Sequence, residues 1–139
     1  MGSLRDLMQD FVNKDYNELL AFAQICKKEV LPACAQIDNE NGEKFLSYIL
    51  VAAVGADGSL SVGENNFFKD LMGYTDEQVD KLTDLYCDKL VDLVKSFFRL
   101  HKGDDISRSL YLLLLCVASC DGTISSDEID YLEELFSIM

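Results

Sequence analysis

The sequence contains very little proline and no tryptophan: Pro32 is the single proline among 139 residues. Few helices can therefore be interrupted by proline, which removes a backbone donor and clashes with the preceding turn. Pro32 itself is expected to end or kink the helix that contains it. No segment alternates apolar and polar residues over the length of a strand, so no sheet is expected.

Basic residues are also scarce, with 12 Lys and Arg against 25 Asp and Glu, and the net charge is −13. This charge repels phosphate backbones and anionic lipid headgroups, which argues against nucleic-acid binding. A basic protein partner or a divalent cation fits its sign. The longest apolar run, residues 110–118, is far shorter than the roughly 20 residues of a membrane span. With no apolar block of a signal peptide near residue 1, a cytoplasmic location is expected.

Sequence signatures of catalysis are missing. His101 is the single histidine, and the chain has no Gly-x-Ser-x-Gly, phosphate loop or H-E-x-x-H motif. We therefore expect no enzyme, with a carboxylate-dependent hydrolase as the remaining catalytic alternative. The five cysteines are odd in number and form no C-x-x-C, which favours small buried side chains in a reducing compartment over disulfides or metal ligands. They are Cys26, Cys34, Cys87, Cys116 and Cys120.

Apolar residues make up 49% of the chain, enough for one core. Helix-period patterns predict an all-α, compact single domain of about seven helices over residues 1–139. N-terminal helices are expected in 1–43 and a first repeat in 44–73. An amphipathic stretch links the repeats in 74–103, as one long helix or two nearly collinear ones. A second repeat follows in 104–139.

The most specific feature is this internal repeat. Asp57-Gly58-Ser59-Leu60-Ser61 and Asp121-Gly122-Thr123-Ile124-Ser125 are separated by 121 − 57 = 64 residues, as are Glu64 and Glu128. In each copy glycine lets an apolar helix end, and the serine and the glutamate form a capping box that starts the next helix. The apolar helices, 45–56 and 106–120, are expected to form the centre of two helical hairpins packed back to back.

The repeat also resembles the second half of an EF-hand loop, in which the acidic residue before glycine and the closing glutamate both bind calcium. The first half of the loop is missing, so neither copy alone supplies enough oxygen ligands. Two half-sites brought together would form one site for a divalent cation (calcium, magnesium, manganese or zinc). Its ligands would be Asp57, Glu64, Asp121 and Glu128. Helix capping without any metal explains the same residues.

These motifs together resemble the tellurite-resistance TerB-like family over roughly residues 44–139. An apolar helix leads into Ala56-Asp57-Gly58 with Ser61 and Glu64, and the pattern returns as Cys120-Asp121-Gly122 with Ser125 and Glu128. The resemblance implies a compact all-α fold with duplicated hairpins and a link to bacterial tellurite resistance or stress response. It also implies that the four acidic residues bind a divalent metal.

The leading interpretation is thus a TerB-like binding or adaptor domain with a protein partner. The alternative is a metal-free helical module for protein–protein interaction, including a homodimer. Four aromatic residues motivate that alternative, because adjacent pairs cannot both be covered by one helix face: Phe67, Phe68, Phe97 and Phe98.

Overall fold

The structure, a computed structural model, describes residues 4–37, 42–54, 62–84, 88–120, 124 and 126–138. Over these residues it contains eight helices and no strand, so the all-α class is confirmed, with one helix more than expected. The helices are α1 (Leu4–Val12), α2 (Tyr16–Ile37), α3 (Gly42–Val54), α4 (Val62–Met72), α5 (Asp76–Thr83), α6 (Asp88–Leu100), α7 (Asp105–Ser119) and α8 (Ser126–Ile138). None of the described helices combines the length and apolarity needed to cross a bilayer.

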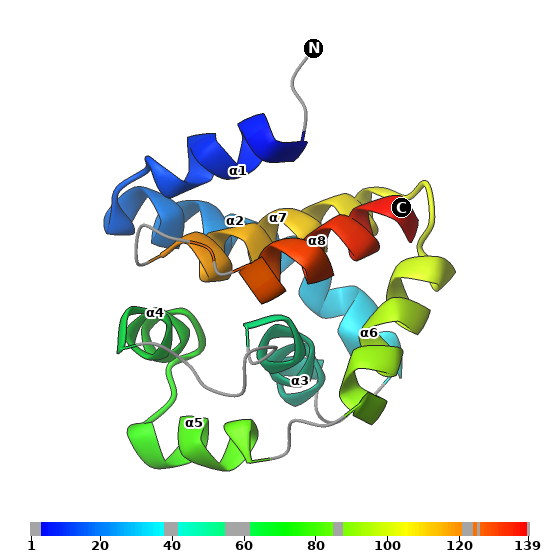
Figure 1. Cartoon of the computed structure of the whole chain (residues 1–139). Coiled ribbons are helices and arrows are strands. Elements are labelled where there is room, and N and C mark those ends of the chain that lie inside the picture. Colours follow the sequence, from blue (N-terminus) through cyan, green and yellow to red (C-terminus); the bar gives the residue numbers. More distant parts are fainter. Residues whose placement is uncertain are drawn as a thin grey trace.

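The helices form layers around α7 (Figure 1). α2, α7 and α8 run side by side in a middle layer, and α1 lies across one side of it. α3 and α4 pack against the other side and are seen nearly end-on in the same view, so they cross the middle layer steeply. α5 lies beyond α3 and α4, and α6 closes one end.

The apolar helices α3 and α7 lie in the core and contact each other, as the repeat predicts. α7 is buried without interruption from Leu113 to Ser119. Its largest contact, however, is with α2 rather than with α3. The N-terminal helices are therefore part of the same core as the repeated segments.

The four aromatic residues that motivated a homodimer are all buried. Phe67, Phe68 and Phe98 are fully covered and Phe97 is 2% exposed. α4 packs against α2, α3, α5 and α7, so it is covered on more than one face. These residues stabilise the fold and cannot form a dimer surface. The large apolar side chains that are exposed are Ile25, Val62, Leu100 and Phe136.

Pro32 does not end α2, which continues to Ile37. Proline at this position leaves the carbonyl of Lys28 without its helical donor. Both side chains are exposed, which places this stretch of the helix at the surface, where water can donate to the carbonyl instead. Of the two expected effects of Pro32, an end or a kink of the helix, the end is therefore contradicted.

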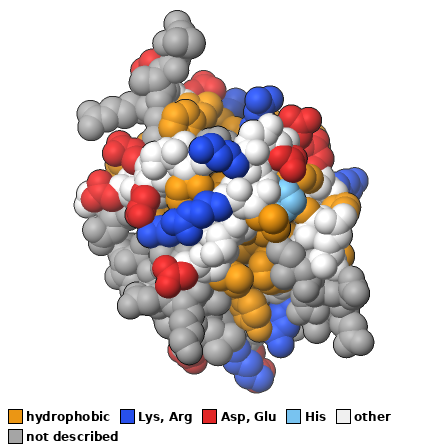
Figure 2. Space-filling model, turned by 90° about the vertical axis from the view of Figure 1, so that its right-hand side faces the viewer, with side chains coloured by type: hydrophobic (Ala, Val, Ile, Leu, Met, Phe, Trp, Pro, Cys, Tyr) orange, Lys and Arg blue, Asp and Glu red, His pale blue; other side chains and the backbone are white. Residues whose placement is uncertain are grey.

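Residues 74–103 form two helices, α5 and α6, rather than one. They point in clearly different directions (Figure 1), so they are not collinear either. α5 begins with a reciprocal capping box: the Thr75 N–H donates to Gln78 Oε1 at 2.8 Å, and the Gln78 N–H donates to Thr75 Oγ1 at 3.3 Å. On the face shown in Figure 2, acidic and basic side chains lie with apolar side chains between them.

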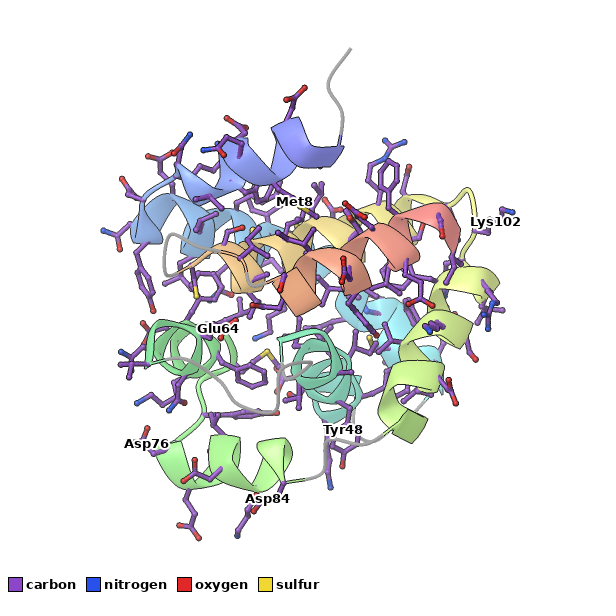
Figure 3. All side chains as sticks on the ribbon, viewed as in Figure 1. Met8, Tyr48, Glu64, Asp76, Asp84 and Lys102 are labelled. Carbon is purple, nitrogen blue, oxygen red and sulfur yellow. The ribbon has the colours of Figure 1, made fainter. Side chains whose placement is uncertain are left out.

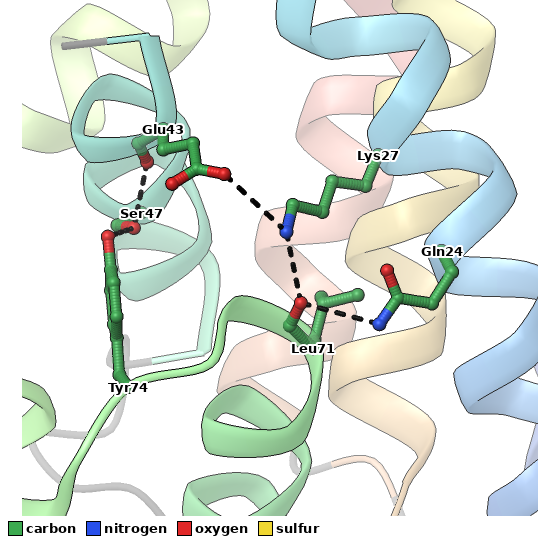
Figure 4. Close-up of polar contacts among 6 residues, drawn as sticks. All are labelled: Gln24, Lys27, Glu43, Ser47, Leu71 and Tyr74. Atoms are coloured by element: carbon green, nitrogen blue, oxygen red, sulfur yellow. Dashed lines mark hydrogen bonds and ion pairs between the residues drawn. The ribbon is translucent and has the colours of Figure 1, made fainter.

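The end of α4 is held by side chains from α2 (Figure 4). Lys27 Nζ and Gln24 Nε2 donate to the carbonyl of Leu71 at 3.1 and 3.4 Å. Such donors satisfy the carbonyls that every helix end leaves open. Gly73, with φ of +72°, then turns the chain away from α4, as its position after the predicted helix indicates.

Candidate metal site

The second helix of each repeat begins at the same place in the motif. α4 begins at Val62 and α8 at Ser126, so the two helix starts are 126 − 62 = 64 residues apart, the offset found in the sequence. Glu64 and Glu128 are therefore the third residues of their helices. This is the position from which a capping-box glutamate bonds back to the residue before the helix.

Both glutamates are buried. Among the side chains whose exposure the structure describes, Glu64 and Glu128 are the only charged ones that are buried, each 4% exposed. A carboxylate taken out of water is costly unless hydrogen bonds or a nearby positive charge stabilise it. Glu64 and Glu128 stand at equivalent positions, so their burial distinguishes these two helix starts from the other charged positions that the structure describes.

The helices that hold the two glutamates pack on the same central pair. α4 and α8 both contact α3 and α7. Glu64 lies on the side of α4 that faces the layer of α2 and α7 (Figure 3), which accounts for its burial. The first turns of α4 and α8 thus bring an acidic side chain into the interior from each repeat.

Asp57 and Asp121, the other two predicted ligands, lie outside the described residues. Within the residues that are described, no group of three His, Cys, Asp or Glu side chains gathers closely enough to hold a metal ion. Of the four predicted metal ligands, the structure therefore describes the surroundings of two, Glu64 and Glu128.

Two further oxygen atoms near these motifs were not predicted as ligands. Ser119 stands in the last turn of α7, two residues before Asp121, and is 1% exposed. Asn65 directly follows Glu64. Neither Ser119 Oγ nor Asn65 Oδ1 has a hydrogen-bond partner in the part of the chain that the structure describes, although both atoms are buried. The sequence gives no signal for either atom, because a serine or an asparagine in a helical segment does not by itself indicate burial.

The buried cysteines are not expected to compete with the carboxylates for a metal ion. Cys26, Cys34 and Cys116 are buried, as expected, and Cys120 is half-buried. Burial raises the pKa of Cys26 to about 11, with a smaller contribution from the nearby Glu29 carboxylate. Burial alone raises the pKa of Cys34 to about 12. Since the thiolate is the form that binds metal, these side chains remain protonated, inert members of the core. Cys87 lies outside the described residues.

His101 lies away from the two helix starts, in the turn between α6 and α7. Its Nδ1 is 3.1 Å from Asp104 Oδ2, and its ring lies 4.6 Å from that of Phe97. Asp104 in turn accepts the Ile106 N–H at 3.1 Å and so caps α7. The histidine therefore supports a helix start in the observed structure.

Comparisons with protein-family models, with curated proteins and with solved structures found no match for this chain. The TerB-like resemblance accordingly stays a prediction. The described residues near the two motifs supply two buried carboxylates, of Glu64 and Glu128, and the buried oxygen atoms of Ser119 and Asn65.

Proposed function

We propose that this chain is a TerB-like, divalent-cation-binding adaptor domain in which Asp57, Glu64, Asp121 and Glu128 hold the ion. The observation that carries the proposal is the burial of Glu64 and Glu128 at equivalent positions of the two repeats. By its family resemblance, such a domain would act with a protein partner in tellurite resistance or stress response in a bacterial cytoplasm.

Helix capping alone does not account for this burial. Two other caps in the described part of the chain are exposed. Thr75 and Gln78 form a reciprocal capping box on the surface. Asp15 likewise caps α2 from an exposed position, accepting the Glu18 N–H at 2.8 Å. The capping side chains Gln78 and Asp15 therefore stay in contact with water, and the burial of Glu64 and Glu128 fits a second role of these carboxylates beside capping.

The kind of cation follows from the ligand atoms. Carboxylate, hydroxyl and amide oxygens are the preferred ligands of calcium, magnesium and manganese, whereas zinc prefers histidine and thiolate. Ser119 and Asn65, which stand near the motifs in the sequence, are candidates for additional neutral oxygen ligands. Of the four cations considered, calcium, magnesium and manganese therefore suit the site better than zinc.

Calorimetric titration of chelator-stripped protein with each of the four cations tests the proposal. We expect saturable binding at about 10⁻⁴ M or tighter, the range of weak calcium modules. Glu64→Gln and Glu128→Gln should each weaken binding, because glutamine still serves a capping box but lacks the negative charge. Glu133→Gln is the matched control, since Glu133 is an exposed glutamate of α8 and its loss should leave binding unchanged.

The stoichiometry separates two arrangements of the site. If the repeats join into one site, one ion binds per chain and either glutamine variant abolishes binding. If each repeat binds by itself, two ions bind and each variant removes one of them. Binding that survives in the double variant Glu64→Gln/Glu128→Gln, or no heat with any cation, would refute the proposal and leave the motifs as helix caps.

The second candidate function is a metal-free helical interaction module. The buried phenylalanines no longer support it, but a groove between α2 and α7 does. That groove shares no residue with the proposed metal ligands, so an interaction at the groove does not require a bound metal.

A further inference from the structure

An apolar groove lies between α2 and α7, with a volume of about 690 Å³. Phe22, Ile25 and Pro32 line it from α2, and Ile106 and Leu112 line it from α7. Ile25 is 58% exposed, an unusual degree of exposure for a large aliphatic side chain on an otherwise well-packed helix. This volume lies within the roughly 300–1,000 Å³ of clefts that bind ligands.

A helix of the chain already packs beside this groove. α1 contacts α7, and the Phe11 ring meets the edge of the Phe22 ring at a centroid distance of 5.8 Å. Met8 and Phe11 are buried by this contact, whereas Asp6 and Asp10 of the same helix remain exposed. α1 thus shows which kind of element fits next to α2 and α7: a short amphipathic helix with acidic residues on its outer side.

The acidic and the basic side chains at the groove differ in the interactions that they make. Glu29 accepts a hydrogen bond from Ser109, and Asp105 stands in the first turn of α7, where the helix dipole favours a negative charge. Lys28 on one wall and Arg108 on the other are both exposed. Over the described residues neither of these two cations has an ion-pair or hydrogen-bond partner, although acidic residues outnumber basic ones two to one in the chain.

We propose that this groove binds an amphipathic helix of a partner protein. The apolar face of that helix covers Ile25, Ile106 and Leu112, and its carboxylates pair with Lys28 and Arg108. Helix-in-groove binding of this kind uses apolar anchors spaced by three and four residues, which is also the spacing of the groove residues on α2. The partner helix is acidic, contrary to what the net charge of −13 alone suggests.

Comparing an acidic with a basic model peptide tests whether the groove prefers an acidic helix. Two synthetic peptides of roughly 18 residues, long enough to hold a helix, share one leucine and alanine face and differ only in flanking glutamates or lysines. Their binding is measured by fluorescence anisotropy at about 0.15 M salt, where long-range attraction is largely screened. We expect the glutamate peptide to bind more tightly, whereas unspecific attraction to an acidic protein would favour the lysine peptide.

Charge reversal at the groove identifies the site. Lys28→Glu/Arg108→Glu should weaken the glutamate peptide by about tenfold or more, because two attractions become two repulsions. Arg99→Glu/Lys102→Glu is the matched control: it makes the same charge change at two other exposed positions that lie outside the groove. The helical circular dichroism signal should be the same in both variants, since all four side chains are exposed.

Three results would overturn the proposal: tighter binding of the lysine peptide, equal weakening by the control variant, or no binding of either peptide. Concentration-dependent dimerisation that only the groove variant loses would assign the groove to a second copy of the chain instead. The titrations are carried out with chelator present and repeated with Glu64→Gln. The outcome at the groove is therefore separate from that of the metal proposal.

Discussion

The hydroxyl of Tyr111 offers the clearest test of how the central helix is tied to its neighbour. It donates to the backbone carbonyl of Leu132 in α8 at 2.9 Å, from a side chain that is 2% exposed. The ring also lies against Phe98 and Phe136. Tyr111→Phe removes the hydroxyl and keeps the ring, so it isolates the hydrogen bond between α7 and α8.

The size of the effect follows from what remains after the change. A neutral hydrogen bond contributes about 0.5–1.5 kcal/mol net to the free energy of unfolding. The Leu132 carbonyl lies inside α8 and keeps its helical donor, so the change leaves no acceptor without a partner. We expect Tyr111→Phe to lower the unfolding free energy by about 1 kcal/mol, against about 3–5 kcal/mol for truncating a buried aromatic ring to alanine.

The dependence on pH gives an independent check. Burial, and secondarily the Glu133 carboxylate, raise the pKa of Tyr111 above its ordinary value. The unfolded chain then loses this proton near pH 10 while the folded chain keeps it, so the stability supplied by this group falls as pH rises above about 10. The difference between wild type and Tyr111→Phe should therefore shrink in that range.

Urea denaturation at pH 7 and again above pH 10 measures both effects. Tyr48→Phe is the control, because Tyr48 is half-buried and no hydrogen bond of its hydroxyl is seen in the described residues. An equal loss in Tyr48→Phe would refute the reasoning. So would a difference between wild type and Tyr111→Phe that stays constant across pH 10.

Two further substitutions test the turns that bound the helices. Gly73→Ala should lower the unfolding free energy by roughly 1–2 kcal/mol in the same assay, because φ of +72° is unfavourable for a residue with a Cβ even though no atom lies within 4 Å of it. Asp104→Ala should lower the thermal midpoint, since it removes the cap of α7 and the contact with His101. The Ile106 N–H and then His101 lower the pKa of Asp104 below its ordinary 3.8, so its contribution is present above that value and is lost as pH falls through the lowered one. The midpoints of wild type and Asp104→Ala should accordingly converge in acid, and a gap that persists below the lowered pKa would contradict the assignment.

Local features of the fold could be predicted because their causes are local. The capping box at Thr75 and Gln78 and the turn at Gly73 depend only on residues within one helical turn. The position of Glu64 and Glu128 in their helices also follows from the repeat. The duplication of the hairpins themselves stays a prediction.

Features that depend on distant segments could not be predicted. Phe67 and Phe68 point in directions about 100° apart on an α-helix, so one covered face cannot bury both. They are buried because several other helices pack around α4, including α2, which comes from a part of the chain with no repeat motif. The burial of Glu64 has the same origin, since α2 and α7 cover that side of α4.

The pairing of α2 with α7 also has a consequence for the order of synthesis. Glu29 and Ser109, which join the two helices, are 80 residues apart, so α2 leaves the ribosome long before its main partner is made. During that interval the apolar side of α2 has no α7 to cover it, and such surfaces are prone to aggregate. The core closes only when residues 105–119 have emerged, so this domain is completed in one step after the synthesis of α7 rather than by a stepwise assembly of its repeats.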